Sequence, residues 1–349
     1  FAGSIGSGGQ ADVQLPTGFT IDVFAEGLNG PRFIAFGPDG ALYVAERGTG
    51  RIVALPDADS DGRADAILPF ATGLDQPHSL AYHEGAWYVG VPSGVVRLDD
   101  QDGDGAAEAQ TAIIDDLPTR VGHTTRTVAF LPDGRMLLSV GSSCNVCTES
   151  DPRRAAIVVY DDATGANEQI FATGLRNAVG LTFQPDSGAL WVTNNGRDLM
   201  GDDVPPETLY QVNEGDHFGW PACHAGTIID PEFGAEGACD GVVQPALIWQ
   251  AHSAPLGLVF YDGDAFPEAY RRKVIGRARV KIAIEAAIRM GWDQVIGTDG
   301  VFIGMLPVGD YNIAGRQFDV TQGVGTQIEL SAKELRNEKK KKSKAPDAE

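Results

Sequence analysis

The stretch GLNGPRFIAFGPDGALYVAERG, residues 27–48, contains the pattern that decides the fold. A short apolar run, a Pro-Asp-Gly turn and a second, alternating apolar run follow one another, as in two antiparallel strands joined by a tight turn. Three further copies begin 46, 48 and 53 residues apart: GLDQPHSLAYHEGAWYVGVPSG (73–94), VGHTTRTVAFLPDGRMLLSVGS (121–142) and GLRNAVGLTFQPDSGALWVTNNG (174–196). A fifth, looser copy is HSAPLGLVFYDGDAFPEAYR (252–271).

A β-propeller is the fold that this repeat predicts, because propeller blades are small sheets that recur at periods of about 40 to 50 residues. A stacked solenoid is the main structural alternative, but the long polar loops between the copies favour blades. The composition agrees with an all-β chain, since 44 glycines and 20 prolines among 349 residues suit many short strands and tight turns. Hydrophobic residues make up 43%, which is enough for a full core.

The chain is strongly acidic, with 27 lysine and arginine residues, 48 acidic residues and a formal net charge of −21. Such a charge repels phosphate groups, so we expect neither nucleic acid nor an anionic membrane surface as a partner. No run of 18 or more apolar residues occurs, and we therefore expect no transmembrane helix. The sequence begins at Phe1 rather than at a methionine, which fits either a removed signal peptide or a fragment.

A composition break at Lys273 divides the chain. The residues before it include 14 arginines, 38 acidic residues and no lysine, whereas the 77 residues from Lys273 onward hold 13 basic and 10 acidic ones. The four-residue spacing of Val280, Ile284 and Ile288 predicts a helix in this later part. We therefore predict four segments: a flexible lead-in (1–12), the propeller (13–272), an atypical α/β segment (273–335) and a disordered basic tail (336–349).

Two acidic loops share one spacing of carboxylates, Asp-x-Asp-x-Asp-Gly-x-x-Asp or Glu. Alternate side chains of a tight loop can converge on a hard cation, and the glycine permits the sharp turn. Each loop is therefore a candidate peripheral Ca²⁺ site. A solvated acidic loop is the alternative, because the usual glutamate at the twelfth loop position is missing. The candidate ligands are Asp57, Asp59, Asp61 and Asp65 in the first loop and Asp100, Asp102, Asp104 and Glu108 in the second.

The four cysteines form two pairs along the sequence, Cys144 with Cys147 and Cys223 with Cys239. A C-x-x-C pair can be a redox motif, half of a zinc site or a local disulfide, and His224 beside Cys223 leaves a zinc site open. An even count with only one C-x-x-C pair favours two disulfides with this pairing, formed in an oxidising compartment. We thus expect a periplasmic or secreted protein.

His123 is the candidate catalytic base. It precedes a strand of the third copy, and the equivalent position of every copy lies at the same end of a propeller, where ligand sites gather. A histidine can act as a base near neutral pH, although a surface or core histidine is the alternative. Arg176 and Asn177 occupy the equivalent position of the next copy, either as a turn-stabilising pair or as ligands for an anion. Gly196 ends that copy and lets backbone carbonyls approach a cation.

Six stretches between about residues 15 and 272 together resemble the glucose/sorbosone dehydrogenase family. They are LPTGFTIDVFAEGLNGPRFIAFGPDGALYVAERG, GHTTRTVAFLPDGRMLLSVGSSCNVCTESDPRRAAI, FATGLRNAVGLTF, GDDVPPETLYQV, FGWP and HSAPLGLVFY. The resemblance implies a soluble six-bladed β-propeller that uses pyrroloquinoline quinone (PQQ) and Ca²⁺. The L-sorbosone or aldose dehydrogenase branch is the most similar one.

The resemblance also implies a role for each matching residue. His123 resembles the base that takes a proton from the substrate hydroxyl, and Arg176 resembles the residue that stabilises the oxyanion developing on the quinone. Four residues match segments that contact the cofactor: Asn177, Asn195, Trp249 and His252. Gly196 and Arg197 match positions whose backbone carbonyls hold the Ca²⁺ that bridges to PQQ.

The implied function is oxidation of an aldose or a sugar aldehyde such as sorbosone. Hydride passes to Ca-bound PQQ, and electrons then pass to an external acceptor, a quinone or a cytochrome. A Ca²⁺-dependent propeller lactonase or esterase and a non-catalytic binding propeller are the alternatives. Quinone-dependent dye reduction separates the dehydrogenase from both, and lactone hydrolysis without PQQ separates the lactonase from the binding protein.

The resemblance ends near Arg272. The family continues with two further blade segments that supply a lysine and two arginines to the PQQ carboxylates, and no such segment is recognisable here. Residues 278–305 instead resemble the C-terminal part of a transketolase, without a thiamine-diphosphate site. The last 77 residues are thus either a foreign segment on a truncated propeller or a set of atypical closing blades.

Overall fold

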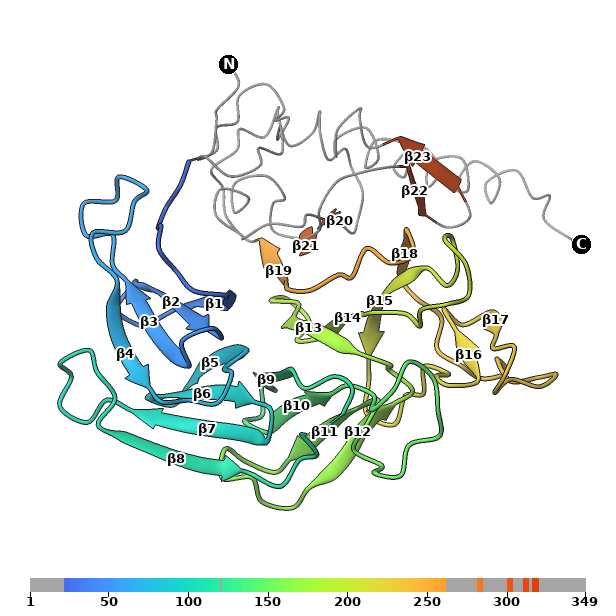
Figure 1. The fold of residues 1–349 in the computed structure, drawn as a ribbon, viewed down its shortest axis with the longest axis horizontal. Helices are drawn as coiled ribbons and strands as arrows, with labels where there is room; N and C mark the ends of the chain where they lie inside the picture. The colour runs from blue at the N-terminus through green and yellow to red at the C-terminus, as the bar shows by residue number, and fades with distance from the viewer. Residues whose placement is uncertain are drawn as a thin grey trace, which may run out of the picture.

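Figure 1 shows a computed structural model of the chain, which describes residues 22–119 and 121–261. It also describes four short strands further on, at 281–284, 300–303, 310–313 and 316–319. The predicted lead-in (1–12) and basic tail (336–349) lie outside the described residues. The described part of the chain contains no helix with the length and apolar character that crossing a membrane requires.

Four four-stranded antiparallel sheets make up most of the described chain. The first contains β1 (Pro31–Phe36), β2 (Leu42–Glu46), β3 (Arg51–Leu55) and β4 (Leu68–Thr72). The second contains β5 (Ser79–His83), β6 (Ala86–Val91), β7 (Gly94–Asp99) and β8 (Ala109–Ile114). The third contains β9 (Arg126–Phe130), β10 (Met136–Val140), β11 (Ala156–Tyr160) and β12 (Gln169–Thr173). The fourth contains β13 (Ala178–Phe183), β14 (Leu190–Asn194), β15 (Glu207–Val212) and β18 (Leu247–Trp249).

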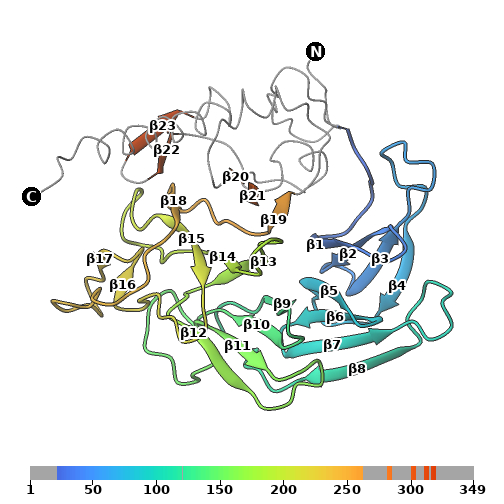
Figure 2. The same cartoon turned by 180° about the vertical axis from the view of Figure 1, so that it is seen from behind.

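These sheets are the predicted blades, and the predicted all-β propeller arrangement is confirmed. Each of the first four sequence copies supplies the first two strands of one sheet. The first strands β1, β5, β9 and β13 contact one another in that order, and both views place them nearest the centre of an arc of sheets (Figures 1 and 2). Loops that precede these strands are thereby gathered from different blades.

Packing between neighbouring sheets explains why the second and third strands of the blades are rich in apolar residues. Successive side chains of a strand point to opposite faces. On β10, Met136 and Leu138 pack against the second sheet, while Leu137 packs against the fourth. All three side chains are 0% exposed. Burying an aliphatic side chain of this size contributes about 1.5–3 kcal/mol, so each interface between blades stabilises both of its sheets.

The fifth copy supplies β19 (Leu258–Tyr261), which contacts β13 of the fourth blade. Its antiparallel partner is β21 (Gly300–Ile303), and β21 also pairs in parallel with β20 (Lys281–Ile284). The prediction of a helix around Val280 and Ile284 is therefore wrong at 281–284, where the chain forms a strand. A spacing of four residues is also a multiple of two, and Val280, Ile282 and Ile284 alternate as in a strand.

Smaller features complete the described fold. A hairpin of β16 (Cys223–His224) and β17 (Ile228–Ile229) lies in the insertion between β15 and β18. A second hairpin pairs β22 (Asp310–Ile313) with β23 (Arg316–Asp319). Both predicted disulfides are confirmed, as Cys144–Cys147 and Cys223–Cys239. The structure therefore contradicts a zinc site at these cysteines.

Candidate active site

The loops that precede β9 and β13 bring His123, Arg176 and Asn177 together. The amide of His123 donates to the carbonyl of Ser142 (2.9 Å), and the amide of Ser142 donates to the carbonyl of Arg176 (2.7 Å). Gly141 fills the space between the two loops. A Cβ atom there would lie 2.5 Å from Asn177 Oδ1 and 2.6 Å from His123 Cβ, so a larger residue would push the loops apart.

The hydrogen bonds of His123 fix the tautomer of its imidazole. Nδ1 lies 3.0 Å from the carbonyl oxygen of Ser142 and 3.1 Å from the hydroxyl of the same residue. A carbonyl oxygen only accepts, so Nδ1 carries the proton and donates it to Ser142. The lone pair is consequently on Nε2, which makes Nε2 the atom able to accept a proton from a bound ligand.

Burial and the neighbouring Arg176 lower the pKa of His123 to about 4. We expect NMR titration of the cofactor-free protein to give this value for the His123 imidazole and a higher value in an Arg176→Gln variant. An unfolded histidine titrates near 6.5, so the unfolded chain binds more protons below that pH. The contribution of this group to stability is thus full above pH 6.5 and is lost as the pH falls toward 4.

An Arg135→Gln variant is the matched control for this titration, because Arg135 is an exposed residue paired with Asp133 and Glu214. It should leave the pKa of His123 unchanged. A wild-type pKa near 6.5 would contradict the burial of the imidazole, and no rise in the Arg176→Gln variant would show that its charge does not reach His123.

Arg176 is a buried cation whose one ion-pair partner among the described residues is an exposed carboxylate. Its side chain is 8% exposed, and its one carboxylate partner there, Asp198 at 3.1 Å, is 61% exposed. Its Nε and Nη2 atoms also donate to the backbone and side-chain oxygens of Asn145, both at 3.0 Å. A desolvated guanidinium held mainly by neutral acceptors keeps its positive charge available to an anionic ligand.

Asn177 follows this arginine in the chain, and its side chain contacts that of Asn195. Nδ2 of Asn177 donates to Oδ1 of Asn195 (3.1 Å), and Nδ2 of Asn195 donates to the carbonyl of Pro255 (2.8 Å). Both residues are at most 8% exposed. The candidate cofactor contact at Asn195 therefore lies beside the candidate contact at Asn177, and the chain leading into β19 contacts Asn195. We call the site formed by His123, Arg176, Asn177 and Asn195 the active-site corner, or simply the corner.

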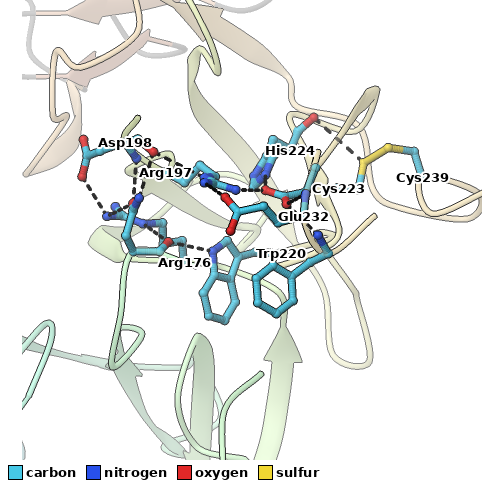
Figure 3. A network of polar contacts seen from close by, with 11 residues as sticks. Arg176, Arg197, Asp198, Trp220, Cys223, His224, Glu232 and Cys239 are labelled. Carbon is cyan, nitrogen blue, oxygen red and sulfur yellow. Dashed lines mark hydrogen bonds and ion pairs between the residues drawn. A yellow bond between two sulfur atoms is a disulfide. The ribbon is translucent and has the colours of Figure 1, made fainter. Parts of the chain in front are cut away.

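Gly196 and Arg197 follow Asn195 directly. The amide of Gly196 donates to Glu207 (2.6 Å), a carboxyl whose pKa burial raises to about 7. The Arg197 side chain pairs with Asp230 and, at 2.7 Å, with Glu232 (Figure 3). Nε2 of His224 donates to the same Asp230 carboxylate at 2.8 Å. This network ties Arg197 to the insertion closed by the Cys223–Cys239 disulfide.

The two remaining candidates, Trp249 and His252, lie in different surroundings. Trp249 ends the outermost strand of the fourth blade and is 0% exposed, so its ring offers no free face in the described structure. His252 is exposed, and its Nδ1 lies 3.5 Å from Asp198, the partner of Arg176. The structure therefore brings His252 to the Arg176 corner through Asp198 and leaves Trp249 within the blade.

The peripheral loops have matching conformations in the first and second blades, between the third and fourth strands of each. Asp65 accepts from the amide of Ala58, and Glu108 accepts from the amide of Gln101, both at 2.7 Å. Oxygen atoms from Asp57, Asp59 and Asp61, and from Asp100, Asp102, Asp104 and Glu108, converge within 4.8 Å in their respective loops. Asp65 does not belong to the first group.

Calcium binding at these loops stays a prediction. If each loop binds with a Kd of about 1 mM, 10 mM Ca²⁺ should stabilise the protein by about 1.4 kcal/mol per loop, seen as a higher Tm. A double variant Asp59→Asn/Asp102→Asn should lose most of this gain. An equal Tm in Ca²⁺ and in chelator, or an equal gain in the variant, would contradict the prediction.

Sequence reasoning missed several residues that shape this corner. Asn145 lies between the two cysteines of the C-x-x-C pair, a motif whose sequence signal comes from the cysteines alone. Arg154 is 4% exposed and donates to five backbone carbonyls around His123. Arg126 is 0% exposed and donates to three carbonyls of the same region. The sequence signal was the stretch GHTTR, where arginine follows His123 by three residues.

The corner fits the groups that the family resemblance implies. Among the described residues, no hydrogen bond ends on the carbonyl oxygen of Gly196 or Arg197, and carbonyl oxygens are ligands that Ca²⁺ prefers. PQQ is an anionic quinone, and the buried Arg176 offers it a positive charge whose one ion-pair partner in the described chain, Asp198, is exposed. Asn177 directly follows Arg176 in the chain, and its side-chain amide is bonded to that of Asn195.

The fold and this corner define a β-propeller in which blade-connecting loops bring polar side chains together. The sequence profile of the glucose/sorbosone dehydrogenase family matches residues 90–295, and the chain belongs to this family. The match extends past Arg272 into the segment whose composition differs.

Individual relatives agree with the family. A pyrroloquinoline quinone-dependent sugar dehydrogenase of Hypocrea jecorina is 25% identical over 303 residues, which covers 70% of this chain and 69% of the relative. The calcium structure of a Trichoderma reesei family AA12 enzyme has a TM-score of 0.59 at 24% identity, over 68% of this chain and 72% of that one. The PQQ-bound aldose sugar dehydrogenase of Streptomyces coelicolor has a TM-score of 0.53 at 20% identity, over 69% and 74%. At this identity the structures support the fold.

A short match to a transketolase is also present, as the sequence resemblance indicated. The enzyme from Sinorhizobium medicae is 54% identical over 56 residues. These residues cover 15% of this chain and 8% of the transketolase, a share too small to carry that activity.

Proposed function

We propose that the protein is a quinoprotein dehydrogenase that oxidises an aldose or a sugar aldehyde related to sorbosone. The observation that carries the proposal is the buried corner where Nε2 of His123, with its proton on Nδ1, meets the buried guanidinium of Arg176. Family membership and PQQ-dependent relatives support the same reaction class. The small-molecule sugar is the substrate, and an external quinone or cytochrome is the electron acceptor.

The chain's own residues have distinct tasks in this reaction. His123 Nε2 accepts the proton of the substrate hydroxyl, while its Nδ1–H stays bonded to Ser142 and keeps the ring oriented. Arg176 binds the cofactor's negative charge, and Asn177 and Asn195 place amide groups next to it. The carbonyls of Gly196 and Arg197 would hold Ca²⁺. When bound, Ca²⁺ and PQQ supply the Lewis acid and the hydride acceptor.

The lactonase alternative requires several carboxylate and amide ligands around one central cation. In residues 22–119 and 121–261, acidic and cysteine groups converge only in the two peripheral loops and at Cys144, Cys147 and Glu149. The amides of Asn177 and Asn195 are bonded to each other and to Pro255. No observation therefore favours the lactonase over the dehydrogenase.

The test is a titration of metal-free protein with PQQ and Ca²⁺, followed by absorbance. We expect saturable binding near one equivalent, and dye reduction with aldoses and sugar aldehydes in the loaded protein. Folded protein that binds no PQQ would overturn the proposal. Lactone hydrolysis without PQQ would point to the alternative enzyme class.

A further inference from the structure

The loop between β10 and β11 contains a covalent ring of four residues, because the disulfide joins Cys144 to Cys147. Asn145 lies inside this ring, half-buried. The proposed mechanism gives this ring no role. Its two cysteines are bonded to each other, and the Asn145 amide is not among the residues assigned to substrate, PQQ or Ca²⁺. Its contacts instead lead to the two residues that the mechanism needs most.

On one side, Asn145 holds the guanidinium of Arg176 at two points. Its backbone oxygen accepts from Nε and its Oδ1 accepts from Nη2, each at 3.0 Å. Two bonds to one planar fork define both the position and the plane of the guanidinium. Figure 3 shows Arg176 in this arrangement, with Trp220 and Asp198 beside it.

Asn145 is itself fixed from three directions. Its Oδ1 accepts from the amide of Asp198 (2.7 Å), and its Nδ2 donates to the carbonyl of Asp198 (2.8 Å). Nε1 of Trp220 donates to its backbone oxygen (3.3 Å). The loops of the third and fourth blades thus meet on one asparagine side chain.

On the other side, the ring is bonded to the support of His123. The hydroxyl of Ser142 donates to the carbonyl of Cys144 (2.6 Å) and accepts from Nδ1 of His123 (3.1 Å). A displacement of the ring would therefore move acceptors of both His123 and Arg176.

We propose that the disulfide-closed ring Cys144–Cys147 is a positioning element that, through Asn145, fixes the Arg176 guanidinium relative to the His123 imidazole. An amide is suited to this task because it orients the guanidinium without neutralising it, whereas a carboxylate would consume its charge. The covalent ring limits the conformations of Asn145 before any ligand binds. Asn145 is thus a positioning residue, and the proposal rests on the proposed function only for the purpose that Arg176 and His123 serve.

The first test uses the cofactor-free protein and needs no activity. Solvent exchange of the Arg176 Nη2 protons, whose acceptor is the Asn145 side chain, is measured by ¹⁵N NMR, with the signal identified by its loss in Arg176→Lys. We expect exchange to accelerate about tenfold in Asn145→Ala and more in Cys144→Ser/Cys147→Ser. Asn213→Ala, at an exposed asparagine bonded to Asp216, is the matched control and should change nothing. Unchanged exchange in Asn145→Ala would overturn the proposal, and this variant keeps both disulfides if the double variant fails to fold.

The second test compares three variants of the loaded enzyme. Asn145→Ala should lower kcat about tenfold with little change in Tm. Asn145→Asp keeps the acceptor for Nη2, so exchange of the Arg176 Nη2 protons should stay slow while kcat falls. Asn213→Ala should keep the wild-type kcat. If wild-type protein binds no PQQ, the proposed function fails, and the exchange measurement still decides the positioning role.

Discussion

Replacement of His123 by alanine is expected to lower kcat for sugar oxidation by a factor of about 10²–10⁴, the usual contribution of a positioned general base. The imidazole is the group at this corner that is neutral at pH 7 and has a free lone pair, on Nε2. Arg176 beside it remains protonated and cannot take a proton. The measurement is steady-state dye reduction by protein saturated with PQQ and Ca²⁺.

The same variant should bind PQQ with nearly wild-type affinity, because the positive charge of Arg176 and the amides of Asn177 and Asn195 are unchanged. His83→Ala is the matched control. His83 of the second sheet stacks on Phe130 of the third at a centroid distance of 3.9 Å. His83→Ala therefore removes a packed imidazole from the interface between these sheets and changes no residue of the active-site corner. A His123→Ala enzyme that retains the wild-type kcat would mean that another group accepts the proton.

The blades could be predicted from the sequence because their signal is local. Each copy holds an apolar run, a tight turn and another apolar run within about 22 residues, and the four sheets follow from that repetition. The strand at Lys281–Ile284 could not be told from a helix, since short apolar runs satisfy both periods. Pairing with β21 decides it, and that partner lies about 20 residues further along the chain.

The site was predictable where the repeat itself marked it. His123 and Arg176 occupy equivalent positions of two copies, so neighbouring blades had to bring them together. The groups that orient them were not predictable in this way. Asn145 is 31 residues from Arg176, and Asp230 is 33 residues from Arg197. Such contacts depend on how two loops pack, which no local pattern records. The burial of Trp249 within its blade is likewise a consequence of packing.

Arg154→Met is expected to lower the free energy of unfolding by about 2–4 kcal/mol, near the upper end for a single substitution. The guanidinium of Arg154 donates to the carbonyls of Pro118, Val121, His123, Gly141 and Ser142. Methionine has a similar length and no donor. Arg126 still serves Pro118 and His123, and the Ser142 carbonyl still accepts from His123, so the loss falls mainly on the carbonyls of Val121 and Gly141. Denaturant unfolding measures the change, and Arg135→Met, which removes exposed ion pairs, should stay within about 1 kcal/mol of wild type.

The Arg154 variant should also lower kcat, by about 10²-fold at a temperature where it remains folded, because it removes the donor that spans the loop carrying His123 and the strand end at Gly141. A displacement of about 1 Å between base and substrate is enough for such a loss. Arg154→Lys separates charge from geometry, since an ammonium keeps the positive charge near the imidazole but cannot reach five carbonyls from one plane. If Arg154→Lys restores stability and kcat fully, the charge alone is sufficient. If it restores neither, the planar fork is what holds the catalytic loop in place.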